Sequence, residues 1–239
     1  MGEPNRRTTE TLTSLPRLFC APNLRCAVVS DHLVLLDLSA GDYHVLDEIG
    51  TAMWMQLLRF PAERDKVGLA EKYHVPQSVV AADLIDFATE QLVAGRLLRS
   101  HVGATNVPVP QMARHRPTIA RAVWERSRAD RDLRKGFAEA YASRTDPAAD
   151  TAPPRVGAAR LMNLFGTAEI LYPTRRAPLD CLPRSLAMTR FLRTAGWQAQ
   201  HVMGVAMYPF DAHAWVELDG VPLGEGATFL QRFTVIQRA

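Results

Sequence analysis

Residues 177–196 read APLDCLPRSLAMTRFLRTAG, and this stretch decides how the second half of the chain is built. Pro183 lies in a run of good helix formers, where a proline belongs in the first helical turn because its missing amide has no partner there anyway. Gly196 is a residue type that commonly ends a helix. The sequence therefore predicts a helix from Cys181 to Ala195, with the cysteine at its N-terminus.

The place of Cys181 at a helix start has a chemical consequence. Unpaired amides and the helix dipole favour an anion there, so the thiol pKa is predicted to lie below its ordinary value of ~8.5. The thiolate is the reactive form of cysteine, whereas a cysteine used only for packing is inert. Cys181 is therefore a candidate nucleophile, provided that another residue serves it as a base.

His213 is the candidate base. A strand predicted over 199–207 leads through a turn to DAHAWVEL, residues 211–218, in which a second strand is predicted from His213 to Leu218. The order helix, strand, strand brings the helix start and the histidine to one edge of an antiparallel sheet, as cysteine catalysis requires. The alternative is that His213 is an ordinary hydrogen-bonded residue of the core.

A carboxylate should orient the imidazole, and the geometry of the next turn decides which one does so. In ELDGV, residues 217–221, a three-residue loop at 218–220 places His213 opposite Glu225 on a third strand, 221–225. A two-residue loop turns Glu225 away, because a shift of one residue moves a side chain to the other face. We predict Glu225 as the acid, with Glu217 as the alternative.

The first half of the chain has a different pattern. CAVVSDHLVLLDLSAGDYHVLDEIG, residues 26–50, contains β-rich runs separated by two turns, and helical apolar spacing follows. The predicted strands are 25–29, 32–37 and 43–46, and the predicted helices are 48–58, 65–73 and 76–95. An interruption at 101–112 then separates this half from helices predicted at 119–141 and 158–171. We expect an α+β chain of two domains, 1–105 with its core at 20–100, and 106–239.

The composition excludes several classes of protein. The 47% hydrophobic and 22% charged residues are typical of a globular protein, and a net charge of +3 is too small to indicate nucleic-acid binding. The Arg-rich run 114–134 also contains acids, and we expect a solvated amphipathic helix there. No apolar run approaches the ~20 residues of a membrane helix, so a cytoplasmic protein is expected. Three cysteines without zinc spacing predict neither a disulfide framework nor a metal site.

DCLPRSLA at 180–187, followed by HAWVEL at 213–218, closely resembles the leader peptidase of lasso-peptide biosynthesis, the B protein. The resemblance covers roughly residues 115–239 and implies a transglutaminase-like, papain-like cysteine protease domain. It implies Cys181 as the nucleophile and His213 as the base. We expect no cofactor and no metal ion. The third member of that family's triad is usually an aspartate in the following strand, and Glu225 occupies the matching place here.

Residues 20–100 are similar to the pyrroloquinoline-quinone D protein, a PqqD-like element that recognises precursor peptides. Three strands and three helices in that order make a winged helix-turn-helix, which the family uses to hold a leader peptide rather than DNA. The predicted third helix carries no lysine or arginine between 76 and 91, which disfavours DNA reading. An extended leader is expected to pair with the strand at 43–46 and to enter a groove beside that helix. The expected leader-binding residues are Tyr43, His44, Val45, Leu46, Val80, Leu84 and Phe87.

Together the two resemblances imply an enzyme that binds the leader of a ribosomal precursor peptide and cuts it from the core. They also imply a partner, a lasso cyclase similar to asparagine synthetase, that closes the freed core into a ring. Two alternatives stay open: a transglutaminase-like transamidase, which uses an amine in place of water, and a non-catalytic scaffold that delivers the precursor. Nucleic acid and membrane are not expected partners.

Overall fold

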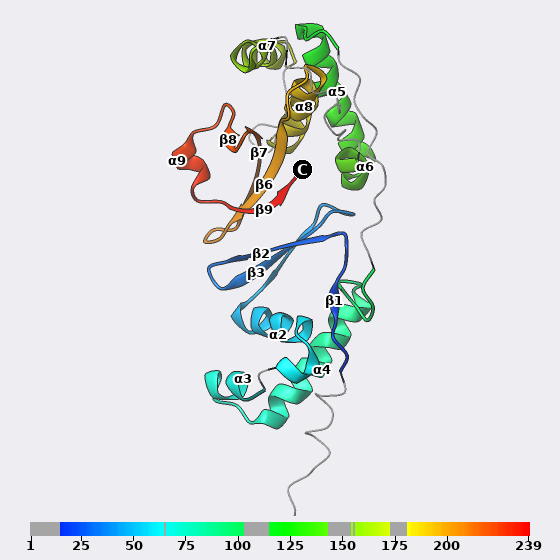
Figure 1. Cartoon of the computed structure of the whole chain (residues 1–239), viewed down its shortest axis with the longest axis vertical. Helices are drawn as coiled ribbons and strands as arrows, with labels where there is room; N and C mark the ends of the chain where they lie inside the picture. Colours follow the sequence, from blue (N-terminus) through cyan, green and yellow to red (C-terminus); the bar gives the residue numbers. More distant parts are fainter. Residues whose placement is uncertain (1–14, 65, 103–114, 143–153, 155, 173–180) are drawn as a thin grey trace, which may run out of the picture. The chain divides into compact units, whose positions relative to one another are not determined.

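The computed structural model describes residues 15–64, 66–102, 115–142, 154, 156–172 and 181–239 (Figure 1). The chain divides into two compact units, Met1–Leu35 with His44–Thr105, and Leu36–Tyr43 with Asn106–Ala239. Both contain helices and strands, which confirms the predicted α+β class. The predicted interruption at 101–112 lies outside the described residues except for its first two positions.

The first region follows the predicted order of three strands and three helices. Its elements are β1 (Phe19–Cys20), β2 (Leu24–Val29), β3 (His32–Asp37), β4 (Tyr43–Leu46), α2 (Glu48–Leu58), η1 (Pro61–Glu63), α3 (Lys66–Lys72), α4 (Gln77–Val93) and β5 (Leu97–Leu98). The strands β2, β3 and β4 form one sheet in that order, so β4 is an edge strand. A short antiparallel ribbon of β1 and β5, which no sequence pattern predicted, completes this region.

Local chemistry explains why α2 begins where it does. The Asp47 side chain accepts a hydrogen bond of 2.8 Å from the Gly50 amide, which satisfies one of the unpaired groups at the helix start. The helix then buries Trp54 and Leu57 in a core that also contains Leu84 of α4. The sheet contributes apolar side chains of β3 to the same core. Burial of one face of each element holds this region together.

The second unit is a helical layer and an antiparallel sheet. Its elements are α5 (Ile119–Lys135), α6 (Phe137–Ala142), α7 (Ala158–Leu171), α8 (Cys181–Thr194), β6 (Gln200–Ala206), β7 (Asp211–Leu218), β8 (Val221–Pro222), α9 (Ala227–Leu230) and β9 (Thr234–Arg238). The strand order is β8-β7-β6-β9. The single helix predicted over 119–141 is wrong, because Gly136, at a φ of 147°, separates α5 from α6. The strand predicted over 221–225 ends at Pro222.

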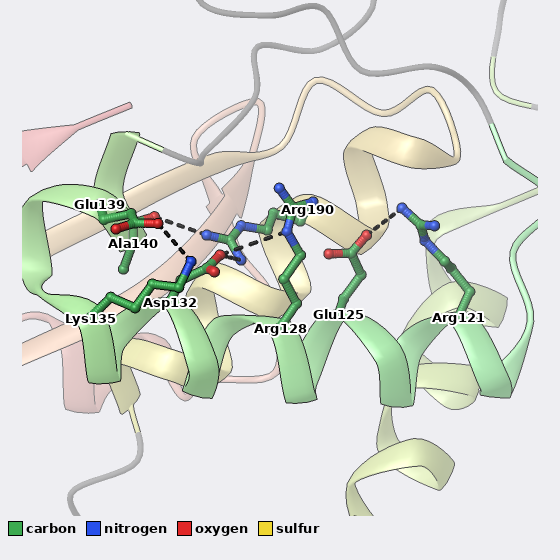
Figure 2. A network of polar contacts seen from close by, with 8 residues as sticks. All are labelled: Arg121, Glu125, Arg128, Asp132, Lys135, Glu139, Ala140 and Arg190. Atoms are coloured by element: carbon green, nitrogen blue, oxygen red, sulfur yellow. Dashed lines mark hydrogen bonds and ion pairs between the residues drawn. The ribbon is translucent and has the colours of Figure 1, made fainter.

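Helix α5 is not the solvated helix that its arginines predicted. It packs against α7 and α8, and it buries Glu125, Arg126 and Asp132. Asp132 accepts a hydrogen bond of 3.2 Å from Arg190 of α8, whose side chain is fully buried and also donates to the Ala140 carbonyl (Figure 2). The mixed charges of this run are therefore used to join three helices inside the unit. In the described part of the chain, no helix has both the length and the apolar character that crossing a bilayer requires.

Gly204 allows the sheet to pack closely behind the candidate histidine. It lies opposite His213 in the pairing of β6 with β7. A Cβ atom at this position would lie 2.8 Å from Cη2 of Trp215 and 3.0 Å from Cβ of Phe233. Both aromatic residues belong to a small apolar core beneath the sheet. A glycine is therefore required here by the close approach of neighbouring side chains.

Candidate active site

Cys181 is the first residue of α8, as the sequence predicted. The backbone amides of Ala214 on β7 and of Leu182 lie near its sulfur and lower the thiol pKa. Ala214 directly follows His213 in the chain. The start of α8 therefore lies beside the first half of β7.

The charge state of the resting thiol differs from the prediction. Burial raises the pKa of Cys181 above its ordinary value, and the Asp211 carboxylate raises it further. The amide hydrogen bonds lower the pKa without offsetting the burial. The prediction that the helix start would lower this pKa is wrong, because desolvation of the sulfur outweighs the helix terminus. A thiol with a raised pKa needs a base to take its proton before it can act as a nucleophile.

Three aromatic side chains surround the His213 ring, and a carboxylate lies near its Nε2 atom. Its ring stacks on Phe233 at a centroid distance of 5.4 Å, meets Phe229 edge-on at 5.3 Å, and lies 6.1 Å from Trp215. The Nε2 atom is buried and has no hydrogen-bond partner among the described residues. The Glu225 Oε2 atom lies 3.6 Å from it, which is too long for a hydrogen bond but within ion-pair range.

Glu225 reaches the histidine by a route that the sequence analysis did not predict. The hairpin of β7 and β8 pairs Glu217 with Pro222, so its loop has the two residues Asp219 and Gly220 and not three. With that register a continued strand would turn Glu225 away. The strand ends instead, and Gly224, at a φ of 71°, turns the chain back so that the carboxylate faces the ring. A loop, and not a strand, therefore places the Glu225 carboxylate beside the His213 ring.

Arg184 is a further member of the site that the sequence did not identify. It lies one turn after Cys181 on α8, and its Nη1 atom donates to Glu225 Oε1 at 3.3 Å. Its Nε atom donates to Glu169 Oε1 on α7 at 2.6 Å. Its two partners come from 15 and 41 residues away in the sequence. No local pattern links residues at such separations.

Glu217, the alternative acid, is engaged elsewhere. Its side chain is buried and accepts a 2.8 Å hydrogen bond from Trp215 Nε1. It also accepts a hydrogen bond from Arg238 of β9. Both of its oxygens accept hydrogen bonds from residues of the sheet, whereas the Glu225 carboxylate lies beside His213.

The residues expected to bind a leader divide into two groups. Tyr43, His44, Val45 and Leu46 form β4, the edge strand, and the Val45 side chain is well exposed. On α4, Leu84 is buried in the main core of its region, Val80 is buried in a smaller cluster, and Phe87 packs against the main core. An edge strand offers unpaired backbone groups to an extended peptide, whereas buried side chains offer it little surface.

A small apolar cavity of about 100 Å³ opens among α2, α3 and α4. It is lined by Ile49, Met53, Leu69, Tyr73, Val75, Val80 and Asp83. Of the α4 residues expected to bind a leader, Val80 is the one that contributes to this lining. The cavity has room for one side chain rather than for a cofactor.

No group of three or more potential metal-binding side chains occurs in the part of the chain that the structure describes. The free cysteines Cys20 and Cys26 are neighbours, with 3.7 Å between their sulfur atoms. Two thiols alone do not complete the four-ligand site that structural zinc prefers.

Comparison with known families separates the two regions in the same way. The sequence model of the transglutaminase-like superfamily matches residues 117–238, just over half of the chain. The model described as coenzyme PQQ synthesis protein D (PqqD) matches residues 32–98. Comparisons with curated proteins and with solved structures found no match. The two family matches confirm both predicted resemblances and are consistent with a fused B protein of lasso-peptide biosynthesis.

Proposed function

The chain belongs to the transglutaminase-like superfamily, and on that premise we propose that it is a cysteine peptidase that removes the leader from a ribosomally made precursor peptide. The superfamily includes cysteine peptidase-like enzymes, and the PqqD match points to precursor binding by the first region. The assignment of these two activities to residues 1–105 and 106–239 is part of the proposal.

One observation carries the proposal above the others. The Cys181 sulfur lies against the amide that follows His213, and a carboxylate lies 3.6 Å from the Nε2 atom of that histidine. A nucleophile, a base and an acid in this order are the parts of a catalytic triad. Helix α8, strand β7 and the segment after β8 supply them, which a purely structural cysteine or histidine does not require.

The position of Glu225 assigns different roles to the two ring nitrogens of His213. If the Nε2 atom carries its proton toward Glu225, the Nδ1 atom is left as the acceptor for the thiol proton. Proton transfer then yields a thiolate and an imidazolium ion, which Glu225 stabilises. The aromatic residues around the ring exclude water and strengthen this interaction.

The reaction follows from these roles. The thiolate attacks the carbonyl carbon at the junction of leader and core, and the imidazolium gives its proton to the departing amine nitrogen as the carbon–nitrogen bond breaks. Water then attacks the thioester, which releases the leader as a carboxylate and restores the thiol. The Cys181 amide at the start of α8 is one donor available to the oxyanion.

Leader capture is assigned to the first region. The exposed edge of β4 offers main-chain hydrogen bonds to an extended leader, and the cavity beside α4 accepts one apolar side chain. Holding the leader on the same chain raises the effective concentration of the cleavage site at the peptidase, which offsets weak contacts at the cut. The freed core amine is then the substrate of a separate asparagine-synthetase-like cyclase.

Mass spectrometry of the purified full chain with a candidate precursor tests the proposal. We expect two fragments, leader and core, and we expect Cys181→Ala to abolish their formation while Cys26→Ala, the matched control, leaves it intact. The Cys181→Ala variant should still bind fluorescent leader, because the capture surface lies in the other region.

The same experiment separates the alternatives. A mass gain equal to an added amine, without cleavage, identifies a transamidase. Unchanged product formation by Cys181→Ala in a reconstituted mixture with the cyclase identifies a delivery scaffold. Either result contradicts the proposed peptidase.

A further inference from the structure

A chain of charged groups runs from the triad acid into the helical layer. Glu225 presents one oxygen to His213 and the other to Arg184. Arg184 in turn donates from Nε to Glu169 on α7. The order is imidazole, carboxylate, guanidinium, carboxylate, and each contact is made by a different atom. None of these side chains is more than about a third exposed, so solvent screens the contacts only partly.

The position of Glu225 makes such support necessary. It lies on the segment between β8 and α9, after a glycine with a positive φ, so no strand pairing holds it. A carboxylate on an unpaired segment samples several rotamers unless another group restricts it. The planar guanidinium of Arg184 provides that restriction, because its donors point in set directions.

Arg184 alone would also work against the triad. A lone cation beside Glu225 competes with the imidazolium for the same carboxylate. Glu169, at 2.6 Å from Arg184 Nε, neutralises the guanidinium and occupies one edge of it. The group of three then carries one net negative charge, which is what the imidazolium ion requires.

We propose that Arg184 and Glu169 are positioning residues that hold the Glu225 carboxylate toward His213 and keep its negative charge available to the imidazolium. This inference rests on the proposed pairing of Cys181 with His213. Its effect on the reactivity of Cys181 can be measured without peptide cleavage.

Two readouts on the full chain test the inference. The first is the rate at which iodoacetamide alkylates Cys181, followed by peptide mass spectrometry that resolves Cys181 from Cys20 and Cys26, as a function of pH. The second is single-turnover cleavage of precursor. Thermal unfolding of each variant verifies that it is folded. The matched controls are Arg134→Met on α5 and Glu139→Gln on α6, both exposed and remote from the site in sequence.

We expect Glu225→Gln to lower the alkylation rate near neutral pH by about 100-fold and Arg184→Met by about 10-fold. Glu169→Gln should cause a smaller loss, and Arg184→Lys should recover part of the activity because it keeps the charge without the planar fork. Each loss should be accompanied by a shift of the rate profile to higher pH, since a poorly held acid stabilises the imidazolium less. The controls should match the wild type.

A double-mutant cycle distinguishes positioning from a general structural role. In the Glu225→Gln background, adding Arg184→Met should cost less than about 2-fold, because Arg184 acts through Glu225. A full additional 10-fold loss, or an unchanged pH profile in Arg184→Met, overturns the inference. Absence of cleavage by the wild type would reject the proposed function instead, and the alkylation cycle would still decide the positioning role.

Discussion

Helix α8 carries an arginine near each end that pairs with carboxylates, and the two groups of ion pairs differ in burial. Near its C-terminal end, Arg190 is fully buried and contacts Asp132 and the Ala140 carbonyl (Figure 2). Near its start, Arg184 is 29% exposed and contacts Glu169 and Glu225, which are 28% and 19% exposed. The same residue types therefore occur in a closed and in a half-open setting on one helix.

This difference in burial indicates separate roles for the two ends of α8, one in stability and one in the proposed reaction. A buried ion pair cannot rearrange without leaving a charge unpaired, so the Arg190 end locks α5 against α8. A half-open group can shift by a fraction of an ångström, as the 3.6 Å separation of Glu225 and His213 requires when the imidazole becomes charged. We expect substitutions at the closed end to reduce stability and substitutions at the open end to reduce the rate.

The largest effect is expected at the closed end. Arg190→Met should lower the free energy of unfolding by about 3–5 kcal/mol, because it removes a fully buried cation that pairs with Asp132. Urea denaturation measures this loss. Lys135→Met, which breaks an exposed pair with Glu139, is the control and should leave the denaturation midpoint unchanged. Equal losses for the two variants would remove the distinction between buried and open pairs.

A smaller effect is expected behind the site. Gly204→Ala should cost about 1–3 kcal/mol, because the new Cβ atom overlaps Trp215 and Phe233. It should also slow cleavage, since both rings support His213. Gly166→Ala on α7 is the control: its Cβ atom meets nothing within 4 Å, and the loss of a helical glycine should stabilise by about 1 kcal/mol. Equal stability of the two variants contradicts the close packing.

The smallest effect is expected for Asp211, whose carboxylate acts on the Cys181 thiol. The Asp211 carboxylate raises the pKa of Cys181, so Asp211→Asn should lower that pKa. Because thiolate forms as the pH rises through the pKa, the variant should reach a given alkylation rate at a lower pH than the wild type. Site-resolved alkylation across a pH series measures the shift. A shift to higher pH would mean that loss of the ion pair with Arg232 disturbs the site instead.

Local patterns were sufficient for most of the secondary structure. Strands β3 and β4 and helices α2 and α7 begin and end at the predicted residues, because turn residues, caps and apolar spacing act over a few positions. The short strands β1, β5 and β9 were missed, since each forms only by pairing with a distant segment. The break at Gly136 was missed because helical periodicity continues across it.

The sequence identified the candidate triad by residue type and spacing, and the structure supplied the reason that it can form. Cys181 and His213 follow from a helix start and a strand start, both of which are local features. The approach of Glu225 depends on where β8 ends and on the turn at Gly224, which no periodicity announces. Which carboxylate faces the imidazole is therefore decided by the fold.

By itself the sequence determined the α+β class, the two regions with their family resemblances, and the residue types available for catalysis. Only the tertiary structure decided the charge of the resting thiol, the use of Glu217 in the sheet, and the link from Glu225 through Arg184 to Glu169. The physical reason is that helix starts, turns and apolar stripes depend on neighbours along the chain. Burial and ion pairing depend on neighbours in space, which only the completed fold brings together.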